Sequence, residues 1–347
     1  MNNKQEELIK AINDDPKNID KYRALSDFYV ENQDLVSAYN VYQEILKLDE
    51  TDIQALLNSG SIKFYARQFD ESKQFYLKAI EYEPENSLIH YNLGNVYAEI
   101  NDFENSIKEY KKAFEYGMNN AQICNAIGIL YSDHGKYTDA KAFFMRALNF
   151  EPDNFECLSN YGTLCQRMGD FREAELSFLK SLDTNPNNEQ VALALANLYA
   201  QLHKKEEAKK YFKLSLDINP QYYSAWVCRA IFYSDEKEFD DAIQYYKNAI
   251  ELDSTKPNAY MLLAHLLSNE KRFEEAIEVY KKSLNLTENK AMVYIFIANA
   301  YMLNSNMKMA IDYYRLAIKE APDNQEIMLI YIDTLNDYIE GKLENAA

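Results

Sequence analysis

A period of 34 residues runs through almost all of this 347-residue chain and constrains its fold more than any other feature. Counted from Ile19, the eighth position of the period is small in nine successive copies, the twentieth is Ala or Ser in every copy, and the twenty-fourth is always Tyr or Phe. A constant period without insertions indicates an array of one supersecondary unit rather than separate globular domains. The eighth-position residues are Ser26, Gly60, Gly94, Gly128, Gly162, Ala196, Ala230, Ala264 and Ala298.

Each copy predicts a hairpin of two helices, A and B. In residues 87–120, apolar residues recur at helical spacing in a first stretch with Leu93 and Tyr97, and again in a second stretch with Ile107 and Tyr110. A short polar segment separates the two stretches and predicts a turn. Small residues at the eighth and twentieth positions let the two backbones approach closely, and we expect the aromatic residue to fill the space toward the next copy.

Nine copies account for residues 19–324, and we expect them to form one elongated domain. Residues 1–18 predict a partial repeat that caps the array as a lone helix B. Residues 325–347 predict a helix A-like cap with a short tail. The nine units are 19–52, 53–86, 87–120, 121–154, 155–188, 189–222, 223–256, 257–290 and 291–324.

The pattern resembles the tetratricopeptide repeat (TPR) family, and the resemblance covers nearly the whole chain. The third unit carries the residues typical of the family motif: Leu93, Gly94, Tyr97, Tyr110 and Ala113. The resemblance implies an all-α, right-handed α-solenoid superhelix of stacked 34-residue helix hairpins. It also implies a non-enzymatic scaffold or adaptor that binds other proteins.

Composition argues against several other classes of function. Thirty-seven basic and 55 acidic residues give a net charge of −18, which disfavours binding to nucleic acid. No apolar run approaches the roughly 18 residues that a membrane span needs, and the first residues lack the apolar core of a signal peptide. The four cysteines have no CxxC spacing and read as small buried hydrophobes in a reducing compartment. We therefore expect a cytoplasmic protein without nucleic-acid or membrane partners.

The sequence does not predict an enzyme. The repeats and the helical ends leave no segment long enough for a separate catalytic domain. The four histidines fall in different units, none at a metal-ligand spacing, and no glycine-rich phosphate loop or nucleophile elbow occurs. We expect neither cofactor nor metal.

The resemblance to TPR proteins implies that helices A line a concave groove, with the second, fifth, sixth, ninth, twelfth and thirteenth positions of each unit facing it. In the first six units these positions are mostly polar. Side-chain amides both donate and accept, so a row of them can pair with the backbone of an extended peptide; alternatively, they are ordinary motif residues that face only water. The candidate binding residues here are Asn58, Tyr91, Asn92, Asn95, Asn125, Asn160 and Asn197.

From the seventh unit the same positions become apolar and rich in methionine. Flexible Met side chains are typical of an adaptable site for an amphipathic helix or a hydrophobic peptide. Alternatively, some of these side chains turn inward and pack in the ordinary way. The candidates in this part are Val227, Ile231, Met261, His265, Met292, Ile295, Asn299 and Met302.

The charges at groove positions favour a neutral or basic partner that is partly hydrophobic. Seven acids face two bases there, and these are Asp20, Asp27, Glu31, Glu99, Asp133, Glu156 and Asp235 against Arg23 and Arg167. TPR domains that grip C-terminal carboxylates use bases at the fifth and sixth positions and Asn at the ninth. Arg23 is the one base at those offsets, and Asp27 stands at a ninth position. A carboxylate clamp is therefore not expected.

Residues 325–340 are unusually apolar for the end of a repeat array, which ordinarily presents a polar face. They predict either packing against a second copy of the chain or a partner, or an ordinary cap with one solvated face. The alternative to an adaptor is thus a structural protein that forms homo-oligomers through this segment.

Overall fold

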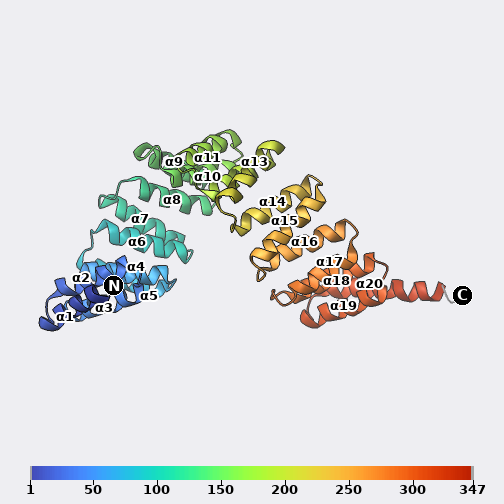
Figure 1. The fold of residues 1–347 in the computed structure, drawn as a ribbon, viewed down its shortest axis with the longest axis horizontal. Helices are drawn as coiled ribbons and strands as arrows, with labels where there is room; N and C mark the ends of the chain where they lie inside the picture. Colours follow the sequence, from blue (N-terminus) through green and yellow to red (C-terminus); the bar gives the residue numbers. More distant parts are fainter. Residues whose placement is uncertain (1, 345–347) are drawn as a thin grey trace. The chain divides into compact units, whose positions relative to one another are not determined.

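The structure, a computed structural model that describes residues 2–344, consists of helices joined by short turns (Figure 1). No strand occurs in these residues, and the expected all-α solenoid of stacked helix hairpins is confirmed. The helices are α1 (Asn2–Asp14), α2 (Ile19–Glu31), α3 (Leu35–Leu48), α4 (Ile53–Tyr65), α5 (Phe69–Tyr82), α6 (Ser87–Glu99), α7 (Phe103–Glu115), α8 (Ala121–Asp133), α9 (Tyr137–Phe150), α10 (Phe155–Arg167), α11 (Phe171–Thr184), α12 (Glu189–Gln201), α13 (Lys205–Ile218), α14 (Tyr223–Asp235), α15 (Phe239–Leu252), α16 (Pro257–Asn269), α17 (Phe273–Ser283), α18 (Lys290–Leu303), α19 (Met307–Glu320) and α20 (Gln325–Glu344).

These helices divide into two compact units, Met1–Thr184 and Asn185–Ala347. The first unit holds α1 and the hairpins from α2–α3 to α10–α11, and the second holds the hairpins from α12–α13 to α18–α19 followed by α20. Within each unit the closest packing is between the two helices of a hairpin, and each helix B then packs on helix A of the following hairpin (Figure 1). The helices A therefore form one column in each unit, and this column positions the candidate site.

In the four hairpins with glycine at the eighth position, the aromatic residue packs directly on that glycine. In the third hairpin, a Cβ added to Gly94 would lie 2.5 Å from Cδ1 of Tyr110, so the ring packs directly on the glycine. Ser106 Oγ donates a hydrogen bond of 2.9 Å to the Gly94 carbonyl oxygen across the same interface. The aromatic residue also reaches the next hairpin, as where Tyr280 stacks on Phe296. The aromatic residue therefore packs within its own hairpin as well as against the next hairpin, whereas the sequence predicted only the second contact.

Every turn between helix A and helix B contains one residue in the left-handed conformation, at the fifteenth position of the period. The φ angles of these nine residues lie between 57° and 79°. Glycine adopts this conformation without strain, but only two of the nine are glycine. The chain thus reverses direction with few glycines. The residues are Gln33, Arg67, Asn101, Gly135, Gly169, His203, Lys237, Lys271 and Ser305.

Asn or Asp side chains cap the start of most helices A. In the first unit, all five helices A have such an N-cap that accepts a hydrogen bond from a backbone N–H of the first turn, as Asn86 does at α6. In the second unit, Tyr222 and Lys256 stand at the equivalent positions before α14 and α16 and give no side-chain cap. The first unit therefore has the more completely satisfied helix starts.

Candidate functional site

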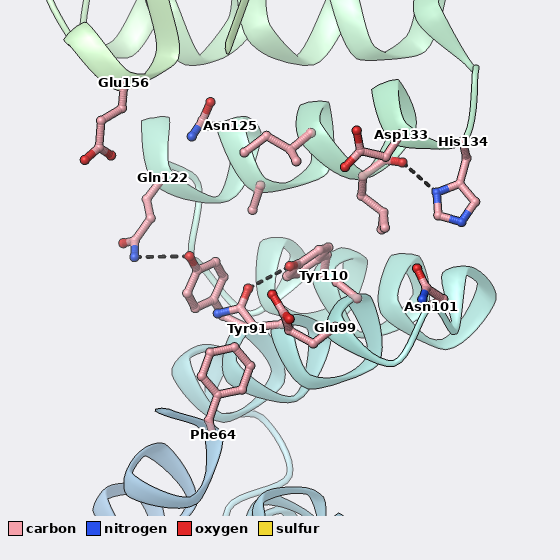
Figure 2. A pocket seen from close by; sticks show the side chains of 15 residues that line it. Phe64, Tyr91, Glu99, Asn101, Tyr110, Gln122, Asn125, Asp133, His134 and Glu156 are labelled. Carbon is pink, nitrogen blue, oxygen red and sulfur yellow. Dashed lines mark hydrogen bonds between the residues drawn. The ribbon is translucent and has the colours of Figure 1, made fainter. Parts of the chain in front are cut away.

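A pocket of about 430 Å³ lies in the first unit, where the third and fourth helices A, α6 and α8, face each other (Figure 2). Its volume is within the usual range for sites that bind small molecules or side chains of a partner. Neighbouring helices A contribute one side chain each, Phe64 from α4 and Glu156 from α10. The other lining residues are Tyr91, Asn95, Ala98, Glu99, Asn101, Tyr110, Gln122, Asn125, Ala126, Ile129, Leu130, Asp133 and His134.

Two hydrogen bonds fix the polar walls of this pocket. Gln122 Nε2 donates to the hydroxyl of Tyr91 at 3.2 Å and so connects α8 with α6, as Figure 2 shows. The hydroxyl of Tyr110, on α7, donates to Asn95 Oδ1 at 2.6 Å. Side chains held in this way lose little conformational freedom when a ligand binds.

The bond from Tyr110 determines what Asn95 can offer a ligand. Burial raises the pKa of Tyr110, and the nearby phenol of Tyr91 and the carboxylate of Glu99 raise it further. The Tyr110 hydroxyl therefore stays protonated and acts as the donor. The Oδ1 of Asn95 is occupied, while its Nδ2 has no hydrogen-bond partner among the described residues. This amide can donate to a carbonyl oxygen of a bound peptide.

A second amide pair continues the polar surface to the next hairpin. Asn160 Nδ2, on α10, donates to Asn125 Oδ1, on α8, at 3.2 Å. The first of these residues lies beside the pocket and the second lines it. The two side chains thus extend the row of amides along the column of helices A.

The pocket is acidic. Three carboxylates line it, and only one of them, Asp133, forms an ion pair, with Arg167 Nη1 at 3.2 Å. Glu99 and Glu156 are exposed and have no ion-pair partner among the described residues. Unpaired carboxylates that share a recess attract cationic groups and strengthen each other's potential. The arrangement suits a Lys or Arg side chain rather than a carboxylate.

The structure brings together part of the predicted set. Tyr91, Asn95 and Asn125 line the pocket, and Asn160 adjoins it. Asn58 lies in a second pocket, formed by α2, α3 and α4 of the same unit.

The other two predicted amides lie apart from the pocket. Asn92 is half-buried on α6 and is not among the lining residues. Asn197 belongs to the second unit, on α12, where its side chain hydrogen-bonds to the thiol of Cys228.

The apolar positions of the second unit do not form one continuous exposed strip. Val227 is only 5% exposed and has no free surface for a ligand. Ile231, Met292 and Met302 are exposed, whereas Met261 is half-buried and its sulfur accepts a hydrogen bond from Ser283.

The remaining predicted residues of the second unit take part in packing. His265 Nδ1 hydrogen-bonds with the Tyr280 hydroxyl at 2.9 Å, and burial lowers the pKa of His265. Asn299 Oδ1 accepts from the Tyr314 hydroxyl in the same way as its counterpart in the third hairpin. Ile295 packs against the core around Ala317. These contacts support the packing interpretation for part of the set.

Sequence reasoning missed the role of the tyrosines at the twenty-fourth position. Four of them hydrogen-bond to the polar ninth residue of their own hairpin. The sequence carries no clear signal for these pairs, because phenylalanine also accompanies a polar ninth residue, as Phe212 does with Asn197, and Tyr246 accompanies the apolar Ile231. The four pairs are Ser61–Tyr76, Asn95–Tyr110, His265–Tyr280 and Asn299–Tyr314.

Other chemistries find no support in the described part of the chain. No three His, Cys, Asp or Glu side chains within residues 2–344 gather as a metal site would require. None of the helices described is both long and apolar enough to cross a bilayer. Burial raises the pKa of each cysteine thiol, that of Cys157 to about 12. The thiols are therefore poor nucleophiles.

The fold and the amide-lined pocket define a class of protein: an α-solenoid whose helix A column presents a binding surface. Three family models, each described as tetratricopeptide repeat, match the chain, and the chain belongs to this family. TPR proteins generally mediate protein–protein interactions and are generally non-enzymatic scaffolds. The matched residues are 166–227 and 233–299, 75–108, and 53–86, 121–154 and 292–324.

Several solved structures share this fold. Yeast Tom70 is 15% identical with a TM-score of 0.55, over 97% of this chain and 92% of that chain. A tetratricopeptide repeat protein from Parabacteroides merdae is 17% identical with a TM-score of 0.53, over 72% and 99% of the two chains. PilF of Pseudomonas aeruginosa is 22% identical with a TM-score of 0.52, over 59% and 93%. Likeness at these identities shows the fold alone. No sequence among the curated proteins matches this chain.

Proposed function

We propose that this protein is a non-enzymatic scaffold, acting in the cytoplasm, that holds an extended basic segment of a partner protein in the pocket between α6 and α8. The observation that carries the proposal is the pair of unpaired carboxylates, Glu99 and Glu156, in a recess with amide-bearing walls. Lys and Arg side chains would pair with the carboxylates, while Asn95 donates to a backbone carbonyl oxygen.

The groove charge also argues against ligands of the opposite kind. A C-terminal carboxylate would meet Glu99, Asp133 and Glu156 with only Arg167 nearby, and Arg167 is already paired. Contacts between like charges in an interface typically cost several kcal/mol of binding free energy. The carboxylate-clamp mode therefore does not fit this pocket.

Charge removal in the pocket tests the proposal. A fluorescein-labelled peptide library with two adjacent Arg residues is titrated against the full chain and followed by fluorescence anisotropy. Glu99→Gln and Glu156→Gln together should weaken binding about tenfold and reduce its salt dependence. Glu115→Gln, an exposed acid on α7 outside the pocket, is the matched control and should change nothing. Equal binding by all three proteins would contradict the proposed site.

A second candidate function, assembly of copies of this chain, is favoured by α20. Leu329 is 62% exposed, and Ile332 and Ile339 are each 48% exposed on this helix. Together with Met328 and Leu335 they follow a helical spacing that makes one apolar face, and two such faces can pack on each other about a two-fold axis.

Light scattering of the full chain over a range of concentrations tests this second candidate. Association should grow with concentration, and Leu329→Lys with Ile332→Lys should abolish it. The same change at the exposed Leu77 on α5 is the control. A monomer at every concentration would rule out assembly through α20.

A further inference from the structure

We infer that the partner segment also fills an apolar pocket on the other side of α4, and that it carries a large apolar residue at least about five or six positions away from its basic residues. This inference rests on the proposed function and adds the chemistry of a second subsite. The second pocket has a volume of about 290 Å³. It is lined by Asp27, Val30, Leu35, Tyr42, Asn58, Ser61, Ile62 and Tyr65.

The walls of this second pocket are apolar side chains with free surface. Val30 is 44% exposed, Leu35 is 40% exposed, and Tyr65 is 77% exposed. They come from α2, from the start of α3 and from α4, so three helices surround one recess. An apolar side chain of a ligand would cover surface that now faces water, and burial of apolar surface is the main source of affinity at such sites.

Polar groups at the edge of the recess continue the row of amides described above. The side chain of Asn58 hydrogen-bonds to Tyr42, the tyrosine at the twenty-fourth position of the first hairpin. Asp27 is an exposed carboxylate at the same edge. A backbone that is held by Asn95 and Asn125 can therefore find a further amide here, and the negative charge of the groove continues.

The two pockets are neighbours because they share α4 as a wall. Phe64 lines the acidic pocket and Tyr65 lines the apolar one, and their ring centroids are 5.8 Å apart in an edge-to-face contact. The pockets are two steps apart along the column of helices A. Neighbouring helices A contact each other far less than the two helices of a hairpin do, so each step exceeds the roughly 8–10 Å between packed helices, and two steps cover more than about 16–20 Å. An extended chain advances about 3.3 Å per residue, so the two anchors must be separated by at least about five or six residues.

The occupant is thus an extended segment of another protein that joins one large apolar residue to a basic pair. Charge complementarity selects it, because Asp27, Glu99 and Glu156 all lie along this path and none has an ion-pair partner among the described residues. A uniformly apolar segment would match only the second pocket, and an acidic segment would match neither.

Synthetic peptides with one Leu and an Arg-Arg pair test the inference. The number of Ser and Ala residues between Leu and the pair is varied from one to nine in both chain directions, and each labelled peptide is titrated against the full chain. We expect weak binding at separations below about five residues and the tightest binding at a separation of about six residues or more. Replacing the Leu by Ser should then weaken binding about tenfold.

Substitutions in the apolar pocket should weaken the binding only of peptides that carry the Leu. Val30→Ser with Leu35→Ser should weaken the Leu peptide about tenfold but leave the Ser peptide unaffected, so that the effects are not additive. Val36→Ser, at a residue that is 74% exposed and outside the pocket, is the matched control. Circular dichroism melting shows whether each variant is folded.

The outcomes separate the two proposals. If binding depends on Glu99 and Glu156 but not on the Leu, its spacing or Val30 and Leu35, the apolar subsite is wrong and the proposed function stands. If no peptide binds, or if the two glutamates make no difference, the proposed function fails and the inference fails with it.

Discussion

The two units build the same hairpin with different small residues at its closest contact. In the first unit, glycine stands at the eighth position of four hairpins, and any Cβ there would collide with the aromatic ring, as at Gly94 and Tyr110. In the second unit the position is always alanine, and Ala264, like the other three, is completely buried. The hairpins of the second unit therefore accommodate a Cβ at this position. The need for a small residue is general, whereas the need for glycine is local.

The binding surfaces differ more than the hairpins do. Asn95 and Asn299 occupy the same position in the two units, and each accepts a hydrogen bond from its tyrosine. Four residues later the first unit has the unpaired acid Glu99, and the second has Leu303, which is exposed. The amide–tyrosine pair thus belongs to the scaffold, and its neighbours determine which ligand the surface suits.

The largest expected effect comes from exchanging the small residues between the units. Gly94→Ala places a Cβ against the buried ring of Tyr110 and should lower the free energy of unfolding by about 1–3 kcal/mol. Ala264→Gly should lower it by about 1 kcal/mol, through helix propensity and lost packing. Urea unfolding followed by circular dichroism measures both. A more stable Gly94→Ala protein would show that the ring moves aside freely and would remove the contrast.

Substitutions at the ninth position should have a smaller effect on stability, and they should distinguish a residue that only supports the fold from one that also binds the ligand. Asn95→Ala and Asn299→Ala each remove the acceptor of a buried tyrosine hydroxyl. Because Ser106 and Thr334 also hydrogen-bond to these two tyrosines, each substitution should cost only about 0.5–1.5 kcal/mol of stability. Only Asn95→Ala should also weaken the Arg-Arg peptides. If both substitutions weakened peptide binding to the same extent, the pocket of the first unit would not be the principal site.

Glycine at the left-handed turns should stabilise both units slightly and equally. Gln33→Gly in the first unit and Lys237→Gly in the second relieve a positive φ and should raise stability by up to ~1 kcal/mol. Gly169→Ala should act in the opposite direction. Thermal melting compares the three variants, and a loss of stability in the first two would mean that these side chains make contacts worth more than the strain.

The smallest effect is a pH dependence confined to the second unit. Burial lowers the pKa of His265 below its ordinary 6.5, so the unfolded chain binds the proton more readily than the folded one. The contribution of His265 is complete above pH 6.5 and is lost progressively as the pH falls below it. His265→Gln should flatten this dependence in urea unfolding at several pH values, while the same change at the exposed His203 should not. Identical pH profiles for all proteins would contradict it.

The fold could be predicted from the sequence because the same pattern of small and aromatic residues recurs in every copy of the repeat. The column that contains Gly94 and the aromatic column predict the hairpin, and Tyr91, Asn95 and Asn125 do gather in one pocket. The position of Val227 within the repeat did not predict that its side chain is buried. A position in the repeat indicates which face of the helix a residue occupies, but not which side chains pack over that face.

The sequence also did not predict which of the acidic residues form ion pairs. Asp133 and Glu99 hold the same position in successive hairpins, yet only Asp133 forms an ion pair, because Arg167 reaches it from the next hairpin. The second pocket escaped notice for a related reason. Leu35 lies outside the groove offsets, and it joins Val30 and Tyr65 only through the way the first two hairpins meet.

The left-handed turns bear on how an incoming ligand meets the molecule. Three of them carry an exposed cation, at Arg67, Lys237 and Lys271, in a chain whose net charge is −18. A basic segment of the kind proposed above would be repelled by such a turn and attracted by the anionic recess. These three turns would thus disfavour encounters of a basic segment away from the recess.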